Sequence, residues 1–179
     1  MGDGRLAVGA LVGFASSVIM DQATSRFYAR QSEASKRKEE ELVPGGTLVQ
    51  LGKQLGQVAG RDLSNDSAQR VGVALHRTLG MSYGMAASLL VGRGVRPLWA
   101  GLVMGLAAFA LVDEGTSIST FSDYLMESHM RGVVGHSTYG LAAGLLLSLA
   151  SAARGPRRRL SPAGTEPGCE AKVPAAGVP

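Results

Sequence analysis

Four stretches of the chain are almost free of charged side chains, and polar segments separate them. They cover residues 6–20, 71–92, 95–112 and 132–153. A helix needs about 20 residues, within a range of about 17–25, to cross the hydrocarbon of a bilayer. The last three stretches reach that length, and the small residues 23–25 lengthen the first. The pattern predicts an all-α polytopic membrane protein with four transmembrane helices, over residues 5–25, 71–92, 95–114 and 132–153.

The third stretch has no face suited to water. Between Leu98 and Val112 the only polar side-chain group is the indole of Trp99, whereas a soluble amphipathic helix needs polar residues on its outer side. A soluble Ala/Gly-rich helical bundle is the alternative to the membrane interpretation. Trp99 follows Arg96-Pro97 as an interfacial anchor does, and a buried core indole is the other interpretation of this lone tryptophan.

The four stretches form two pairs of similar sequences. The first and third share the pattern G-x-x-x-G-x-A-x5-D-x-x-T-S at an offset of 92 residues, beginning at Gly9 and Gly101. The second and fourth match at an offset of 56, from Tyr83-Gly-Met-Ala-Ala and Tyr139-Gly-Leu-Ala-Ala onward. Similar composition explains the shared glycines but not the shared Asp-x-x-Thr-Ser endings. We therefore predict a duplicated helical hairpin, since internal repeats are common in membrane bundles.

Each stretch contains one G-x-x-x-G pair, which places two glycines on one helix face and lets two backbones approach closely. The pairs are Gly9/Gly13, Gly80/Gly84, Gly101/Gly105 and Gly140/Gly144. We expect the lipid bilayer to be the principal partner, with a homo-oligomer through these glycine-rich faces as a further prediction.

The polar insert over residues 26–70 contains an apolar stripe at helical spacing. Its members are Leu48, Leu51, Leu55, Val58 and Leu63. This spacing predicts an amphipathic helix on the membrane or on the bundle, and an ordinary solvent-facing helix packed on a neighbour is the alternative. Residues 1–153 thus form one membrane domain, and the Arg/Pro-rich tail over 154–179 is predicted to be disordered.

The ionisable side chains of the four stretches gather at one end of the predicted bundle. Four crossings place the ends of the first and third helices level with the beginnings of the second and fourth. Ionisable groups in a bilayer are costly, usually paired, and the first candidates for function. The residues at this level are Asp21, Asp113, Glu114, His76, Arg77 and His136.

Two interpretations of this level remain open. Two histidines and three acids form a possible proton or divalent-cation site, because histidine titrates near neutral pH and His with carboxylate suits transition metals. Alternatively Arg77 pairs with Asp21 or Asp113, and the histidines hold the bundle together by hydrogen bonds. Tyr83 and Tyr139 follow their histidines at helical spacing, so a His–Tyr ladder facing the interior is a further possibility beside ordinary packing.

Composition and motifs argue against several classes of function. The chain has 179 residues, 18% of them charged, and a single cysteine, Cys169. Residues 154–179 hold five basic and two acidic residues, so three of the net four positive charges lie in the tail, and no motif supports nucleic-acid binding. There is no G-x-S-x-G, P-loop or HExxH motif. We expect no enzymatic activity and no cofactor.

Orientation rests on the distribution of arginine and lysine. Arg5, Arg93, Arg96 and the arginines over 154–159 favour both termini in the cytoplasm, whereas the basic residues over 26–38 argue the other way. We predict cytoplasmic termini. The first stretch also resembles a signal peptide, but no Ala-x-Ala site follows it, and Asp21 interrupts the region where cleavage would occur.

A family resemblance follows from short motifs over residues 5–153. They are Leu75-His76 with Gly80 and Tyr83-Gly84, a Gly-rich third helix ending in Asp113-Glu114, and Gly135-His136-Ser-Thr-Tyr139-Gly140. This combination resembles the YagU-like family of uncharacterised bacterial inner-membrane proteins. The resemblance implies a bacterial inner-membrane location and about four helices, and it supplies no activity or catalytic residue. A non-enzymatic bundle or scaffold is the first prediction of function, and a proton- or divalent-cation-handling, transporter-like protein is the second.

Overall fold

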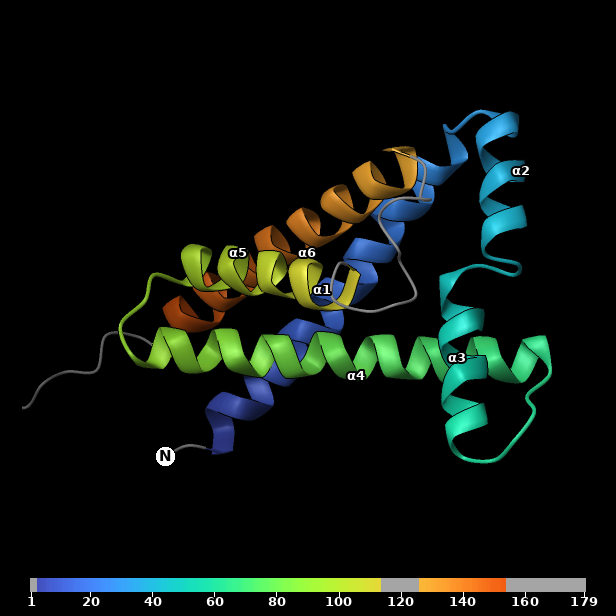
Figure 1. The fold of residues 1–179 in the computed structure, drawn as a ribbon. Coiled ribbons are helices and arrows are strands. Elements are labelled where there is room, and N and C mark those ends of the chain that lie inside the picture. Colours follow the sequence, from blue (N-terminus) through green and yellow to red (C-terminus); the bar gives the residue numbers. More distant parts are fainter. Residues whose placement is uncertain (1–2, 114–125, 154–179) are drawn as a thin grey trace, which may run out of the picture.

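The computed structural model describes residues 3–113 and 126–153, and every regular element in those two segments is helical (Figure 1). This confirms the all-α prediction for the described part of the chain. The elements are α1 (Asp3–Ala29), α2 (Glu33–Leu42), α3 (Thr47–Val58), α4 (Asn65–Gly92), α5 (Pro97–Ala108), the π-helix η1 (Phe109–Asp113) and α6 (Met126–Ala153).

Local signals explain where several helices begin. The Ser64 side chain caps α4 by accepting a hydrogen bond from the Ser67 amide at 3.4 Å. Gly94, with φ of 98°, turns the chain after α4, and Pro97 occupies the first turn of α5, where its missing N–H is not needed. α4 and α6 each begin six residues earlier than the hydrophobic stretches predicted, because polar turns continue both helices beyond their apolar parts.

Four long segments make the body of the molecule. α1 packs against α4, α5 packs against α6, and α1–α6 and α4–α5 contacts join the two pairs. Figure 1 shows α4 crossing α1 at an angle, with α5 and α6 side by side on one side of α4. Each of these neighbouring pairs runs antiparallel, so the C-terminal half of α1 lies near the N-terminal half of α6.

α3 is the helix that the apolar stripe of the insert predicted, and it packs on the N-terminal part of α4. A Cβ added to Gly52 would lie 2.8 Å from the Ala68 Cα, and one added to Gly72 would lie 3.1 Å from the Leu48 Cα. Glycine therefore permits backbone contact between α3 and α4. The buried face of α3 is not the stripe itself: Val49, Gly52 and Gly56 are buried, whereas the stripe residues Leu48 and Leu51 are half-buried and Leu55 and Val58 are exposed.

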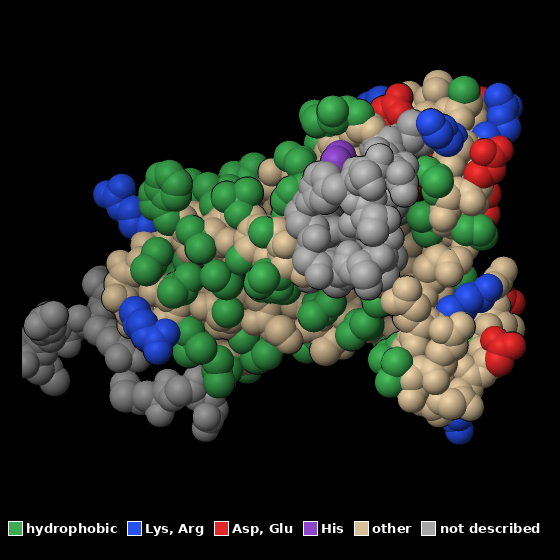
Figure 2. Space-filling view, in the orientation of Figure 1, with side chains coloured by type: hydrophobic (Ala, Val, Ile, Leu, Met, Phe, Trp, Pro, Cys, Tyr) green, Lys and Arg blue, Asp and Glu red, His purple; other side chains and the backbone are tan. Residues whose placement is uncertain are grey.

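The core contains small side chains and the surface contains large apolar ones. Ser16 and Ser17 are the largest side chains that are less than 2% exposed in the described residues, and Ala87, Ala100 and Ala143 are fully buried. The exposed apolar side chains include Leu11, Trp99, Leu106, Leu111, Leu145 and Leu149, which are 58–69% exposed. Figure 2 shows this apolar surface over the body of the molecule, with most charged side chains at its two ends.

Two of the described helices are long and apolar enough to cross a membrane, by length and composition alone. They are Gly4–Ala29 and Met126–Ala153. Pro97–Leu111 is apolar but shorter. These helices are weak evidence for membrane association. The core helix of a soluble protein and an N-terminal signal sequence can be equally long and apolar.

Candidate functional site

Glycine contacts set the register of the two helix pairs. A Cβ added to Gly9 of α1 would lie 2.8 Å from the carbonyl oxygen of Gly84 in α4. A Cβ added to Gly140 of α6 would lie 2.9 Å from the carbonyl oxygen of Gly101 in α5. Gly9 and Gly101 are 92 residues apart, and Gly84 and Gly140 are 56 apart. The α1–α4 and α5–α6 contacts therefore use positions that correspond under the two sequence offsets.

A charged cluster joins α1 to α4, about three turns beyond Gly9 in α1 and about two turns before Gly84 in α4. Asp21 of α1 pairs with the Arg77 guanidinium, and the His76 Nε2 lies 3.1 Å from the Asp21 Oδ1. Arg77 also donates a hydrogen bond of 3.0 Å to the Ser17 hydroxyl, which in turn donates to the Phe14 carbonyl at 2.8 Å. Opposite charges and hydrogen bonds thus link two helices at one level of the bundle.

This cluster is only partly shielded by the protein. The Asp21 side chain is 37% exposed, whereas those of His76 and Arg77 are 23% and 21% exposed. The guanidinium carbon of Arg77 lies 5.8 Å from the centroid of the Phe14 ring, which shields one side of it. Arg77 is the positively charged partner of Asp21, so a divalent cation at this carboxylate would be repelled by the guanidinium.

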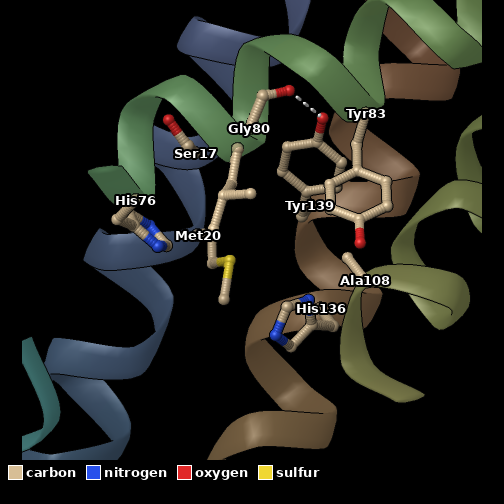
Figure 3. Close-up of a pocket in the computed structure, with 9 residues that line it drawn as sticks. Ser17, Met20, His76, Gly80, Tyr83, Ala108, His136 and Tyr139 are labelled. Carbon is tan, nitrogen blue, oxygen red and sulfur yellow. Dashed lines mark hydrogen bonds between the residues drawn. The ribbon is translucent and has the colours of Figure 1, made fainter. Parts of the chain in front are cut away.

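A small cavity of about 30 Å³ lies beside the cluster (Figure 3). α1, α4, α6 and the end of α5 all contribute to its wall, and His76 and His136 both line it. A volume of this size holds about two water molecules. The other lining residues are Ser17, Met20, Leu79, Gly80, Tyr83, Ala108 and Tyr139.

The two tyrosines play different parts in this wall. The buried Tyr139 hydroxyl donates a hydrogen bond of 2.6 Å to the Gly80 carbonyl, which ties α6 to α4. Tyr83 also lines the cavity, and its hydroxyl is directed toward the Ala108 and His136 side (Figure 3). Tyr139 is therefore a structural contact between the two helix pairs, and Tyr83 presents its hydroxyl toward His136.

The π-helix η1 places an aromatic ring against His136. The Phe109 ring centroid lies 5.7 Å from that of His136 and 6.5 Å from that of His129. Under the sequence offsets, Phe109 corresponds to Ser17 and His136 corresponds to Gly80, and a Cβ on Gly80 would lie 2.9 Å from the Ser17 Cβ. The same helix–helix contact thus uses two small residues in one pair and two rings in the other. π-helical turns frequently occur at functional sites.

The structure brings most of the predicted site residues together. Asp21, His76 and Arg77 form the charged cluster, and His136, Tyr83 and Tyr139 line the cavity beside it. Asp113 ends η1, and Glu114 lies outside the described residues. Among the described residues, no group of three His, Cys, Asp or Glu side chains is placed to hold a metal ion.

The sequence did not predict several of the polar contacts that the structure shows. Nothing in the sequence pattern identified Ser17 as a site residue. In the structure its hydroxyl accepts a hydrogen bond from Arg77, which lies sixty residues later in the chain. A second cluster, formed by Glu39 of α2 and Arg131 of α6, lies at the end of the bundle near α2. Both residues come from segments that hydropathy alone assigns to loops, and their pairing depends on tertiary structure.

The glycine pairs do not face outward. Those of α1 and α4 meet each other, as do those of α5 and α6, within one chain. A second copy of the chain therefore has no free G-x-x-x-G face among the described helices unless helices are exchanged between copies.

Comparison with known proteins returned no match, neither to a protein-family model, nor to a curated protein, nor to a solved structure.

Proposed function

We propose that this protein is a multi-pass membrane protein whose four long helical segments form a non-enzymatic bundle or scaffold. The observation that carries the proposal is the reversed size distribution of its side chains. Alanine, glycine and serine occupy most of the buried positions, beside a few larger residues such as Tyr139 and Leu147, while other leucines and Trp99 cover the outside. In water this arrangement would expose many large apolar side chains, and soluble monomers rarely expose large contiguous apolar surfaces. In lipid the large apolar side chains face apolar acyl chains. The helices then associate through close backbone packing at small residues.

Trp99 supports the same conclusion. Its indole is 59% exposed and follows Pro97 at the start of α5, so it is not a buried core residue. Exposed tryptophan at the end of an apolar helix is typical of the membrane–water interface.

The proposal includes four crossings arranged as a duplicated hairpin. Its support is the corresponding register of the α1–α4 and α5–α6 contacts, which the two sequence offsets relate. It further includes a bacterial inner-membrane location with cytoplasmic termini, as the resemblance to the YagU-like family and the arginine distribution imply. Under this proposal the cluster of Asp21, His76 and Arg77 joins α1 and α4, as paired polar side chains do in membranes.

Cysteine labelling of the full-length chain in intact cells tests the number of crossings. Cys169 reports the position of the tail in the natural sequence, and Glu40→Cys and Arg93→Cys report the two connections in a Cys169→Ser background. Four crossings place Arg93 on the same side as Cys169 and opposite Glu40. If only α1 and α6 cross, Arg93 is labelled on the same side as Glu40, and the four-crossing proposal fails.

Membrane extraction tests the more basic claim. The chain should stay in the membrane pellet after a carbonate wash and should need detergent for purification. Recovery in the supernatant as a detergent-free monomer would instead identify a soluble Ala/Gly-rich helical bundle.

Proton or divalent-cation handling is the second candidate function, and the cavity favours it. Two histidines from different helices line one small space, beside a carboxylate, and histidine exchanges protons near neutral pH. Since Arg77 already neutralises Asp21, this geometry supports a proton rather than a divalent cation.

Proton uptake by liposomes containing the purified protein and a pH-sensitive dye separates the two functions. Transport should fall at least tenfold in the His76→Ala and His136→Ala variants. His129→Ala is the matched control, because His129 contacts Phe109 but does not line the cavity. A scaffold shows no uptake in any of these proteins, and the histidine variants then change only thermal stability.

A further inference from the structure

α2 differs from the other helices in how it is held. It is a ten-residue helix in which Ser35 is the only buried residue, and it has no extensive packing interface with another described element. No apolar side chain within α2 is buried. Val43, at its C-cap, is 7% exposed, and among the described residues the helix itself contacts the bundle through polar side chains.

These polar contacts form one interface, which we call the latch. On α2, Ser35 and Glu39 are four residues apart and lie on the same face of the helix. The Ser35 hydroxyl donates a hydrogen bond of 2.8 Å to Glu127, and the Glu39 carboxylate accepts one of 3.1 Å from Ser128. Arg131 of α6 donates to both carboxylate oxygens of Glu39, one of these contacts being 3.0 Å.

The Glu39–Arg131 pair is the centre of the latch. The two side chains are only 12% and 18% exposed. Arg131 also donates a hydrogen bond of 3.2 Å to the Gln31 side chain, and its guanidinium carbon lies 5.2 Å from the centroid of the Tyr28 ring. Removing one member of such a pair leaves the other charge shielded from water without its partner, which is strongly unfavourable.

The chain turns sharply on both sides of α2. Gly45 and Gly46 follow it with φ of 76° and 83°, and a tight turn precedes it, in which the Gln31 amide donates to the Tyr28 carbonyl at 3.0 Å. α3 stays fixed beyond the glycines, because its backbone contacts α4 at Gly52. α2 is thus a short rigid segment between two turns, tethered at both ends.

We propose that α2 is a strap that opens and closes as a unit over the N-terminal turns of α6, and that the Glu39–Arg131 latch holds it closed. Two contacts of the helix are independent of the latch, because Ser32 caps its first turn and Lys36 pairs with Glu33 within it. Opening uncovers the Arg131 guanidinium and the Ser128 hydroxyl at the end of α6. The strap does not depend on the number of membrane crossings, nor on the proton-handling function.

Distance measurements between spin labels test the strap in the purified full-length chain. The labels go on Arg37→Cys, on the exposed side of α2, and on Leu141→Cys, which is 46% exposed on α6, in a Cys169→Ser background. The natural latch should give one narrow distance distribution. Glu39→Gln and Arg131→Ala should each add a second, separate population, while the Leu11→Cys/Leu141→Cys pair within the bundle stays unchanged.

Glu33→Gln is the matched control, because it breaks an ion pair inside α2 and leaves the latch intact. It should keep the single narrow distribution, and the exchanged pair Glu39→Arg/Arg131→Glu should restore much of it. The proposal is overturned if both latch variants leave the distribution unchanged, or if Glu33→Gln changes it as much as Glu39→Gln does. A distribution that is already broad with the natural latch also overturns it.

Discussion

Tyr139 of α6 donates a buried hydrogen bond of 2.6 Å to the backbone carbonyl of Gly80 in α4. The bond crosses between the two helix pairs, at a point where α4 and α6 otherwise have few contacts. The same glycine admits α1 on another side, since a Cβ on Gly80 would lie 2.9 Å from the Ser17 Cβ. The hydroxyl is buried, so this bond to a backbone carbonyl helps to fix how α6 packs against α4.

Tyr139→Phe should lower the free energy of unfolding by about 1 kcal/mol, the usual net value of a hydrogen bond. The ring stays in place, so little packing is lost. Thermal unfolding of the detergent-purified protein measures the change. Tyr83→Phe is the control, since no hydrogen bond of the Tyr83 hydroxyl occurs among the described residues, and it should have a smaller effect. Equal losses in both variants would contradict this role for Tyr139.

Gly9→Ala should lower the free energy of unfolding by about 1–3 kcal/mol, the usual cost of overpacking. The new methyl group would lie 2.8 Å from both the Gly84 carbonyl oxygen and the Met85 Cα, so α1 and α4 must separate. Gly4→Ala offers a matched comparison on the same helix, because nothing lies within 4 Å of its Cβ position. That variant should be neutral or slightly stabilising, since alanine favours helix more than glycine does. The comparison fails if Gly4→Ala destabilises as much as Gly9→Ala.

The sequence was informative where a periodic pattern determines structure. Hydropathy and turn residues located the cores of α1, α4, α5 and α6, and the apolar stripe located α3. Helix ends were less well predicted, since polar turns extend α4 to Asn65 and α6 to Met126. α2 was not predicted at all, because its ten residues bury only Ser35 and show no apolar face.

The sequence predicted how far along the bundle the site residues lie, but not which side chains contact one another. Counting helix ends placed Asp21, His76 and Arg77 at one level, and the structure adds that all three meet. No such counting identifies Ser17 as the acceptor for Arg77, or Phe109 as the ring beside His136. Those contacts depend on how each helix is rotated about its axis. The backbone contacts of Gly9 with Gly84, and of Gly101 with Gly140, set this rotation.

Asp21→Asn should destabilise the protein by about 2 kcal/mol, because it leaves the Arg77 guanidinium without its charged partner. The estimate lies below that for a fully buried pair, since the Asp21 side chain is 37% exposed. The double variant Asp21→Asn/Arg77→Met should recover part of the loss, because it removes the unpaired charge as well. A double-mutant cycle from thermal unfolding measures the coupling. Additive effects of the two substitutions would show that the pair does not stabilise the α1–α4 contact.

Leu145→Lys distinguishes a lipid-facing surface from a water-facing one. Leu145 is 58% exposed near the middle of the apolar part of α6. In water a lysine at such a position changes stability by less than about 0.5 kcal/mol, whereas a lysine at the centre of a membrane helix costs about 2.5–3.5 kcal/mol on insertion scales. We expect the variant to reduce the fraction of chain recovered in the membrane pellet and to lower thermal stability in lipid vesicles.

Val58→Lys is the matched substitution on α3, outside the apolar helices, where the side chain is 85% exposed. It should leave membrane recovery unchanged, because a charge there stays in water or at the interface. Both variants replace an exposed aliphatic side chain by lysine. A difference between them therefore shows whether lipid or water surrounds this face of α6. If Leu145→Lys is as harmless as Val58→Lys, water reaches that face of α6, and the large apolar side chains on the outside need another explanation than lipid.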